Sequence, residues 1–331
     1  MKLIYTNMAG LDQIRKPITQ ELTQFDTFFR DLMKTEVPLL NFVMRYLLRR
    51  KGKQMRPILV FLSAKMLGKP SESTFTAAAL IEIMHTATLI HDDVVDDSFE
   101  RRGFFSINAL WKSKVSVLVG DYLLAKGLLL TVNKREYELL NIVADAVREM
   151  SEGELLQIRN SRKLYISQEE YFEIIRKKTA TLISCCSACG AKSVGMPEET
   201  VTKMQRFGEL LGIAFQIKDD LLDYQPHSFA GKPLGNDLKE KKLTLPLIHA
   251  LEQSEPAEKK KILRLMHKPG KSSGTFREVL DFVEYQGGMA YADRQMNEYV
   301  ARALQILEEF PEGETKESLK QFASYTIARN K

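Results

Sequence analysis

The feature that most constrains the fold is the spacing of apolar residues, which recur at helical intervals along almost the whole chain. This periodicity is typical of amphipathic α-helices, whose buried side chains share one face. Glycine and proline number only 18 and 11 among 331 residues, which indicates few turns and long helices. No stretch of useful length alternates apolar and polar residues as a half-buried strand would. The pattern predicts an all-α protein, with helices at 18–33, 36–50, 56–67, 74–98, 105–131, 135–160, 168–195, 198–225, 243–253, 256–266, 275–309 and 314–329.

The breaks between these helices are short and do not mark a domain boundary. They fall at 68–70, 195–197, 226–235 and 311–313, and no repeat, linker or low-complexity segment separates one part from another. We therefore expect a single domain over residues 1–331, although chain length alone would suggest about two.

Composition and charge exclude some classes of protein and favour others. The formal net charge is only +5, and acidic and basic residues are interspersed, so the chain lacks the basic footprint of a nucleic-acid binder. A mildly basic protein suits small anionic substrates or a membrane surface.

The N-terminus lacks an apolar core of signal-peptide length, and charged residues such as Asp121 and Lys126 interrupt the most apolar stretches. The cysteines Cys185, Cys186 and Cys189 have no His or further Cys nearby to complete a zinc site. We therefore expect them to be reduced side chains that pack in a helix of a cytoplasmic protein.

Two acidic clusters end the two most apolar helices. Residues 77–90 are apolar nearly all round and lead into the first cluster, while 207–217 lead into the second. Both clusters have the pattern D-D-x-x-D, and at about 100° per residue the first and last aspartates of each share a helix face. Carboxylates near a helix C-terminus oppose the helix dipole and repel one another, so a cation should offset them. Oxygen ligands without Cys or clustered His favour Mg²⁺, which usually keeps waters and adds substrate phosphates. The predicted ligands are Asp92, Asp93, Asp96, Asp219, Asp220 and Asp223.

Basic residues that suit a diphosphate lie close to both clusters in the sequence. Arginine can contact phosphate oxygens in pairs, and lysine acts as a point charge. His85 precedes Asp92 by seven residues, two helical turns, so both face nearly the same way. A lone histidine on an apolar helix is usually a core residue, but its position here makes a diphosphate contact at least as plausible. The basic candidates are Lys53, Arg56, Arg101, Arg102, Lys178, Lys232 and Lys242.

These motifs, in this order, resemble the trans-type polyprenyl diphosphate synthases, and most closely the octaprenyl/heptaprenyl branch. The resemblance covers a motif-bearing core at about 45–250: G-K-x-x-R-P at 52–57, the segment 85–98, R-R-G at 101–103, 117–122, G-E-L-L-Q at 153–157, K-T-A at 178–180, 215–224 and 231–238. Two positions depart from the family pattern, Phe105 in place of proline and Lys241 in place of glycine. Neither removes a ligand or a diphosphate contact.

The resemblance implies an isoprenoid-synthase helical bundle around a central catalytic cavity, usually a homodimer. It also implies condensation of isopentenyl diphosphate with an allylic diphosphate, such as farnesyl diphosphate, by ionisation, condensation and elimination, with release of the allylic pyrophosphate. By resemblance, Arg101, Lys178, Lys232 and Lys242 hold the allylic diphosphate, and Thr179 and Gln216 present oxygen dipoles to the cation. Isopentenyl diphosphate is assigned to Lys53, Arg56, His85 and Arg102.

Product length depends on the helix that leads to Asp92. Ala87 and Thr88 lie one turn before it and Met84 two turns before, roughly 12 Å below the aspartates. In the family, bulky aromatic residues at the first two of these positions stop growth at short products. The small residues here predict a long all-trans product, hexaprenyl to octaprenyl, with a floor formed by Leu124, Leu128 or Leu129. Such a product would also hold the enzyme near a membrane.

Three other functions are considered beside this one. The first is a short-chain farnesyl or geranylgeranyl diphosphate synthase. The second is a class I terpene cyclase, whose second metal motif usually carries Asn, Ser and Glu rather than repeated aspartates. The third is a non-catalytic synthase subunit, which tends to lose aspartates that this chain keeps.

Overall fold

The computed structural model describes residues 10–49, 52–101, 104–161, 163–224, 242–267 and 273–328. Within these ranges the protein is all-α, as predicted, apart from one hairpin of two short antiparallel strands, β1 (Glu100–Arg101) and β2 (Phe104–Phe105). The helices in chain order are a turn at 10–15, η1 (Lys16–Ile18), α2 (Thr19–Leu32), α3 (Pro38–Arg49), α4 (Met55–Leu67), α5 (Glu72–Val95), α6 (Ile107–Asn133), α7 (Tyr137–Asn160), α8 (Gln168–Ile175), η2 (Arg176–Ala180), α9 (Thr181–Lys192), α10 (Glu198–Asp223), α12 (Leu245–Gln253), α13 (Pro256–His267), α14 (Ser273–Tyr285), α15 (Gly288–Glu308) and α16 (Glu314–Ala328).

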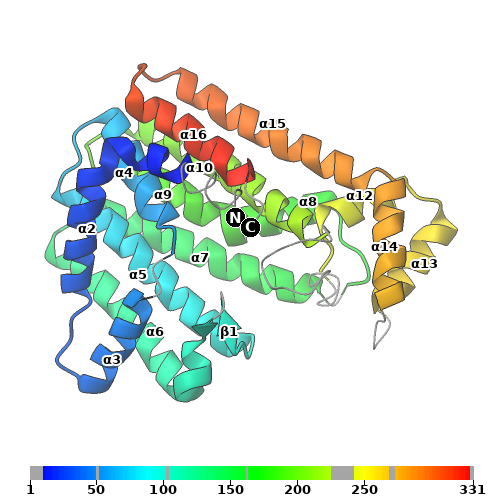
Figure 1. Ribbon diagram of the computed structural model, residues 1–331, viewed down its shortest axis with the longest axis horizontal. Helices are drawn as coiled ribbons and strands as arrows, with labels where there is room; N and C mark the ends of the chain where they lie inside the picture. Colours follow the sequence, from blue (N-terminus) through cyan, green and yellow to red (C-terminus); the bar gives the residue numbers. More distant parts are fainter. Residues whose placement is uncertain are drawn as a thin grey trace.

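The most apolar helices lie inside the bundle. Figure 1 shows α2 and α3 at one end of the molecule, α13 and α14 at the other, and α15 with α16 along one long edge. The apolar side chains of 77–90 and 207–217 are mostly buried, which confirms the burial predicted for both segments. Removing such side chains from water contributes about 1.5–3 kcal/mol each. The two helices that carry the aspartates are therefore fixed by the core.

Two predicted helices differ from the structure. Residues 275–309 were expected to form one helix, but the chain turns between α14 and α15 at Gly287, whose φ is 73°. The following Gly288 packs so closely that an added Cβ would lie 2.2 Å from the carbonyl oxygen of Pro246. The segment 168–195 is interrupted by η2, a single turn of π-helix. The extent of the single domain, 1–331, stays a prediction.

A separate apolar cluster lies between α3, α5 and α6, and we call it the α3–α6 cluster. The inward faces of α3 and α6 meet the side of α5 that carries Ala87. Its buried members are Met33, Val43, Met44, Ile83, Ala87, Ile90, Ile107, Val119 and Leu123.

Two of the described helices, α5 and α6, are long and apolar enough to cross a membrane by length and composition alone. Most of the apolar stretch of α5 is buried, as in the core helix of a folded bundle, whereas most of that of α6 is not. Much of the apolar outward face of α6 is therefore exposed.

Candidate active site

The aspartates lie at the C-terminal ends of the two buried helices. Asp93 and Asp220 are 5% and 4% exposed, so these two carboxylates point into the protein. The remaining four, which the sequence placed pairwise on shared helix faces, retain access to solvent: Asp92, Asp96, Asp219 and Asp223. Because these ends carry the negative pole of the helix dipole, the accessible carboxylates are well placed to bind a cation.

Within the described part of the chain, no three His, Cys, Asp or Glu side chains converge into a closed metal site. Mg²⁺ seldom needs one, since it is commonly held by one or two carboxylates together with waters and substrate phosphates. Hard oxygen donors at the ends of two helices fit an ion shared with a diphosphate rather than an ion enclosed by protein alone.

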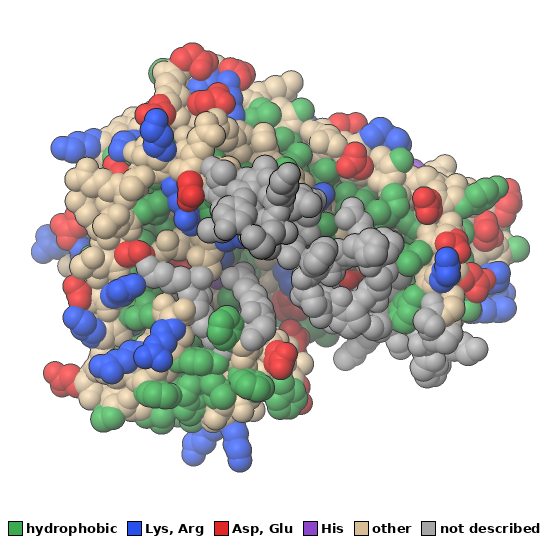
Figure 2. Space-filling model, in the orientation of Figure 1, with side chains coloured by type: hydrophobic (Ala, Val, Ile, Leu, Met, Phe, Trp, Pro, Cys, Tyr) green, Lys and Arg blue, Asp and Glu red, His purple; other side chains and the backbone are tan. Residues whose placement is uncertain are grey.

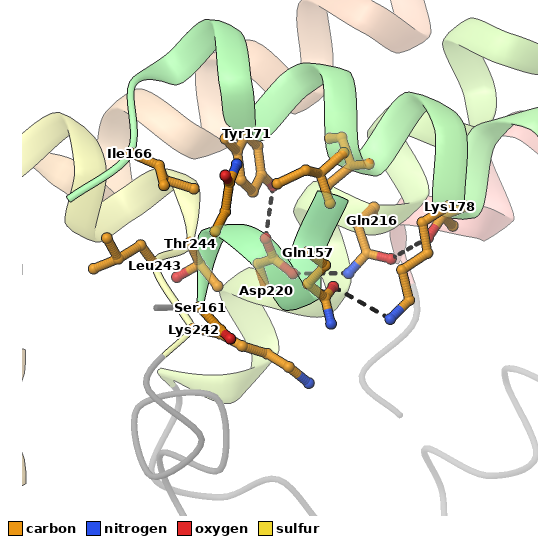
Figure 3. Close-up of a pocket in the computed structure, with 14 residues that line it drawn as sticks. Gln157, Ser161, Ile166, Tyr171, Lys178, Gln216, Asp220, Lys242, Leu243 and Thr244 are labelled. Carbon is orange, nitrogen blue, oxygen red and sulfur yellow. Dashed lines mark hydrogen bonds between the residues drawn. The ribbon is translucent and has the colours of Figure 1, made fainter. Parts of the chain in front are cut away.

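A pocket of about 200 Å³ opens beside the second aspartate cluster (Figure 3). It brings together residues from five parts of the chain: the end of α7, helix α8, the π-turn η2, helix α10, and the segment that leads into α12. Five of its lining residues were predicted from the sequence: Lys178, Thr179, Gln216, Asp220 and Lys242.

A chain of hydrogen bonds fixes the polar wall of this pocket. The Thr179 hydroxyl donates to Oε1 of Gln216 at 2.8 Å, and Nε2 of Gln216 donates to Oδ1 of Asp220 at 2.8 Å. The buried Tyr171 hydroxyl donates to Oδ2 of Asp220 at 2.6 Å. A carboxylate without a proton can only accept hydrogen bonds, so Asp220 holds the Gln216 amide with its NH₂ group inward and its carbonyl oxygen toward Thr179. These hydrogen bonds fix the orientation of the Gln216 amide in the pocket wall.

The π-turn η2 places Lys178 and Thr179 in the pocket. Turns of π-helix are frequent at functional sites, because the extra residue shifts side chains off the regular helical face. Helix α7 approaches η2 so closely at Gly153 that an added Cβ would lie 2.7 Å from the backbone nitrogen of Lys178. The glycine of the G-E-L-L-Q motif therefore makes room for the π-turn η2.

Two side chains of the G-E-L-L-Q motif contact the Lys178 ammonium group. Its Nζ lies 2.5 Å from Oε2 of Glu154 and donates to Oε1 of Gln157 at 3.2 Å. These contacts keep the ammonium group at the mouth of the pocket, as Figure 3 shows, and its charge there would attract a diphosphate.

Three of the residues predicted to hold isopentenyl diphosphate, Lys53, Arg56 and His85, are not among those that line this pocket. Arg56 on α4 pairs with Glu82 on α5, with Nε 2.7 Å from Oε1 and a second, longer contact of 3.4 Å to Oε2. His85 follows Glu82 on the same helix by three residues. The Lys53 ammonium lies 5.5 Å from the ring centroid of Tyr325 on α16. The pairing with Glu82 fixes the direction of the Arg56 guanidinium.

The predicted chain-length residues lie on α5 where it meets other helices. Ala87 is fully buried in the α3–α6 cluster, and Met84 lies against α6 at Gly127. The prediction of the tunnel floor is wrong for two of its three residues. Leu128 and Leu129 are 44% and 59% exposed, so they do not lie in the interior. The third, Leu124, packs against both apolar clusters. Thr88 is partly buried and donates to the carbonyl oxygen of His85.

Three predicted cationic residues cannot be placed. Arg102 and Lys232 lie outside the described residues, as does the whole 231–238 motif, and only the backbone of Arg101 is described.

Sequence reasoning did not single out Tyr171 and Glu82, although both contact predicted site residues. The available signal was helical spacing, since Tyr171 precedes Lys178 by seven residues and Glu82 precedes His85 by three. Spacing alone could not show which helix would face them.

Comparison with known proteins agrees with this geometry. The family model described as polyprenyl synthetase matches residues 37–283. Octaprenyl diphosphate synthase from Haemophilus influenzae is 33% identical over 98% of this chain and 98% of its own length.

Solved structures share the fold over nearly the full chain. A polyprenyl synthase from Caulobacter crescentus, complexed with calcium and isoprenyl diphosphate, is 32% identical with a TM-score of 0.88 and covers 97% of this chain and 98% of its own. A geranylgeranyl pyrophosphate synthase from Bacteroides thetaiotaomicron is 36% identical with a TM-score of 0.82, covering 97% and 100%. An all-helical bundle with paired aspartate clusters and a cationic pocket defines an isoprenoid-diphosphate enzyme. The chain belongs to the polyprenyl synthetase family. It is a prenyltransferase, a polyprenyl diphosphate synthase.

Proposed function

We propose that this enzyme makes a long all-trans polyprenyl diphosphate, of hexaprenyl to octaprenyl length, from isopentenyl diphosphate and an allylic primer such as farnesyl diphosphate. The observation that carries the proposal is the position of Ala87, a small side chain that lies one turn below Asp92 and opens onto the α3–α6 cluster. A hydrocarbon chain growing from the aspartates along α5 would meet only apolar side chains there.

The aspartates and the cationic pocket divide the work of the reaction. Asp92, Asp96, Asp219 and Asp223 would hold Mg²⁺ together with the allylic diphosphate, and the bound ion supplies Lewis-acid stabilisation of the leaving group. Lys178 and Lys242 add positive charge where negative charge grows as the C–O bond breaks. The Thr179 and Gln216 oxygens face the cation, and Arg56, Lys53 and His85 hold isopentenyl diphosphate for attack. Arg101, Arg102 and Lys232 would complete the diphosphate contacts.

Water must be kept from the cation, because it would quench the intermediate before condensation. The buried faces of α5 and α10 supply an apolar wall behind the aspartates. The proton lost in the last step goes to the released pyrophosphate in this family, and we propose the same route here, without a protein base.

Assembly and location form part of the proposal. The outward face of α6 is rich in exposed apolar side chains, among them Leu118 at 60% and Leu129 at 59% exposure. Apolar surface of this extent marks an interface, and we expect a second copy of the chain to cover it in a homodimer. The three cysteines are free and buried, which suits the reducing cytoplasm. A long-chain product would associate the enzyme peripherally with a membrane.

The test is incubation of the purified protein with farnesyl diphosphate and labelled isopentenyl diphosphate, followed by chromatography of the dephosphorylated products. A main product of six to eight isoprene units supports the proposal. A geranylgeranyl product, or a farnesyl product formed only from a shorter allylic primer, would identify the short-chain alternative, which a geranylgeranyl synthase at 36% identity keeps open. Hydrocarbon released from farnesyl diphosphate alone would identify a cyclase, and complete inactivity of the isolated chain with farnesyl and shorter primers alike would identify a non-catalytic subunit.

A further inference from the structure

An aromatic and apolar surface covers the outer side of α3 and the start of α6. Val37, Leu39 and Phe42 are 56%, 51% and 62% exposed, although they lie in or beside a helix. Phe104 and Phe105 on β2 are 54% and 56% exposed. Figure 2 shows hydrophobic side chains gathered over α3, the start of α6 and β1. We call these five residues the α3 surface.

Aromatic contacts hold the three elements together. The Trp111 ring on α6 lies in edge contact with Phe42 at 5.9 Å and with Tyr46 at 5.3 Å between ring centroids. The Tyr46 hydroxyl donates to the carbonyl oxygen of Phe105 at 2.7 Å. Helix α6 is interrupted directly after Trp111, where Lys112 has φ 66° and ψ 167°. The α3 surface is therefore one connected patch.

Most of the charge beside this patch is positive, although Glu36 precedes Val37 and Glu100 pairs with Phe105 in the hairpin. Arg45 and Arg49 on α3, and Lys112 and Lys114 on α6, are all exposed. The stretches 37–49 and 106–120 contain no Asp or Glu. Aromatic and aliphatic side chains flanked by Lys and Arg are the composition of a surface that lies in the headgroup region of an anionic membrane.

A second copy of the chain fits this surface less well. In a symmetric dimer the same patch meets itself, so the four cations would lie near the same four cations, and Asp121 is the only acid on α3 and α6. The long apolar face further along α6, at Leu118 and Leu129, lacks this concentration of charge and is the better site for a dimer.

The inner side of α3 lines the α3–α6 cluster, into which the product is proposed to grow. Val43 and Met44, on the opposite face of the helix from Phe42, are buried with Ala87 in the α3–α6 cluster. Helix α3 therefore lies between the cluster that would receive the growing chain and the exposed α3 surface.

We propose that the α3 surface docks on an anionic lipid bilayer, with Arg45, Arg49, Lys112 and Lys114 at the headgroups and the exposed aromatic side chains in the interfacial layer. Docking would bring the far end of the product cluster next to the membrane that takes up a long prenyl chain. This purpose rests on the proposed long-chain product, whereas the binding itself does not.

The test is sedimentation of the full-length protein with vesicles, either of phosphatidylcholine alone or with about 30% of an anionic phospholipid. The wild type should bind the anionic vesicles and release at high salt. The double variant Arg45→Glu/Lys114→Glu should bind at least about tenfold more weakly. The matched control Lys260→Glu/Arg277→Glu makes the same change of charge on α13 and α14 and should bind like the wild type.

Further measurements separate the possible causes. Phe42→Ser should weaken binding to anionic vesicles at a salt concentration where the charge contribution is small. Prenyltransfer activity in detergent should be the same in every variant as in the wild type, which separates docking from catalysis. Absence of this activity in the wild type would contradict the proposed function but not the vesicle binding. Equal vesicle binding by the Arg45→Glu/Lys114→Glu variant and the control would overturn the proposal. So would loss of the dimer in Phe42→Ser, measured by light scattering, because the partner would then be a second copy.

Discussion

Replacing Tyr171 with phenylalanine removes one hydroxyl from the polar wall of the pocket and changes little else. Tyr171 and Asp220 are both 4% exposed, and the hydroxyl donates to Oδ2 of the carboxylate at 2.6 Å. The capping box of Ser167 and Glu170 fixes the start of α8, the helix that carries Tyr171. Without the hydroxyl, Asp220 keeps the Gln216 amide on one oxygen but loses the donor on the other.

The magnitude follows from the value of a hydrogen bond to a charged group, about 1.5–3 kcal/mol. If the whole loss fell on the transition state, kcat would drop by about 10- to 150-fold, since each factor of ten costs about 1.4 kcal/mol. Part of the loss will appear as lower stability, because the bond also exists without substrate. We therefore expect kcat to fall about tenfold, with KM for both substrates within about threefold of wild type.

The assay is steady-state kinetics with thermal unfolding measured in parallel, and Tyr165→Phe serves as the matched control. The Tyr165 hydroxyl also donates to a carboxylate, Oε1 of Glu252 at 2.7 Å, but Glu252 does not line the pocket. A Tyr171→Phe variant that is destabilised like the control but keeps wild-type kcat would show that the hydroxyl is structural only. Our account of how Gln216 is oriented would then be wrong.

Three further predictions follow from the site and the surface. Asp92→Ala and Asp219→Ala should each lower turnover by orders of magnitude while circular dichroism stays unchanged, and full activity with excess chelator would contradict the metal assignment. Lys53→Ala should raise KM for isopentenyl diphosphate more than for the primer, whereas Lys178→Ala should raise KM for the primer more and also lower kcat; the reverse pattern would mean that the two substrate sites are exchanged. Leu129→Glu should shift the dimer toward monomer in analytical ultracentrifugation, since a charge on an apolar interface is costly to bury, and an unchanged dimer would place the interface elsewhere.

Most of the helices were predictable because each buries one apolar face, and that periodicity is written in the sequence. The aspartate clusters were also predictable, since charged residues that follow long apolar runs are unusual. The break at Gly287 was not, because a glycine pair within a helical pattern does not reveal a positive φ or the close approach of Pro246. Nor was the π-turn, because one extra residue hardly alters the apolar pattern.

Contacts between helices limited what could be predicted about the site. Lys178, Thr179 and Gln216 were selected from short motifs, and the structure brings them into one pocket. The part played by Tyr171 depends on how α8 packs against α10, which helical periodicity does not determine. For the same reason, Leu128 and Leu129 were placed in the interior although they face outward.

The central claim is that the product grows from Asp92 along α5, past Ala87, into the α3–α6 cluster. The most direct measurement is the product length of Ala87→Phe beside wild type, with farnesyl diphosphate and labelled isopentenyl diphosphate. The bulky ring would fill the path one turn below the aspartates, so the main product should shorten from hexaprenyl–octaprenyl to geranylgeranyl length, the shortest that a farnesyl primer can give, while catalysis continues. A wild-type product no longer than geranylgeranyl, or an active variant with unchanged product length, would contradict the claim.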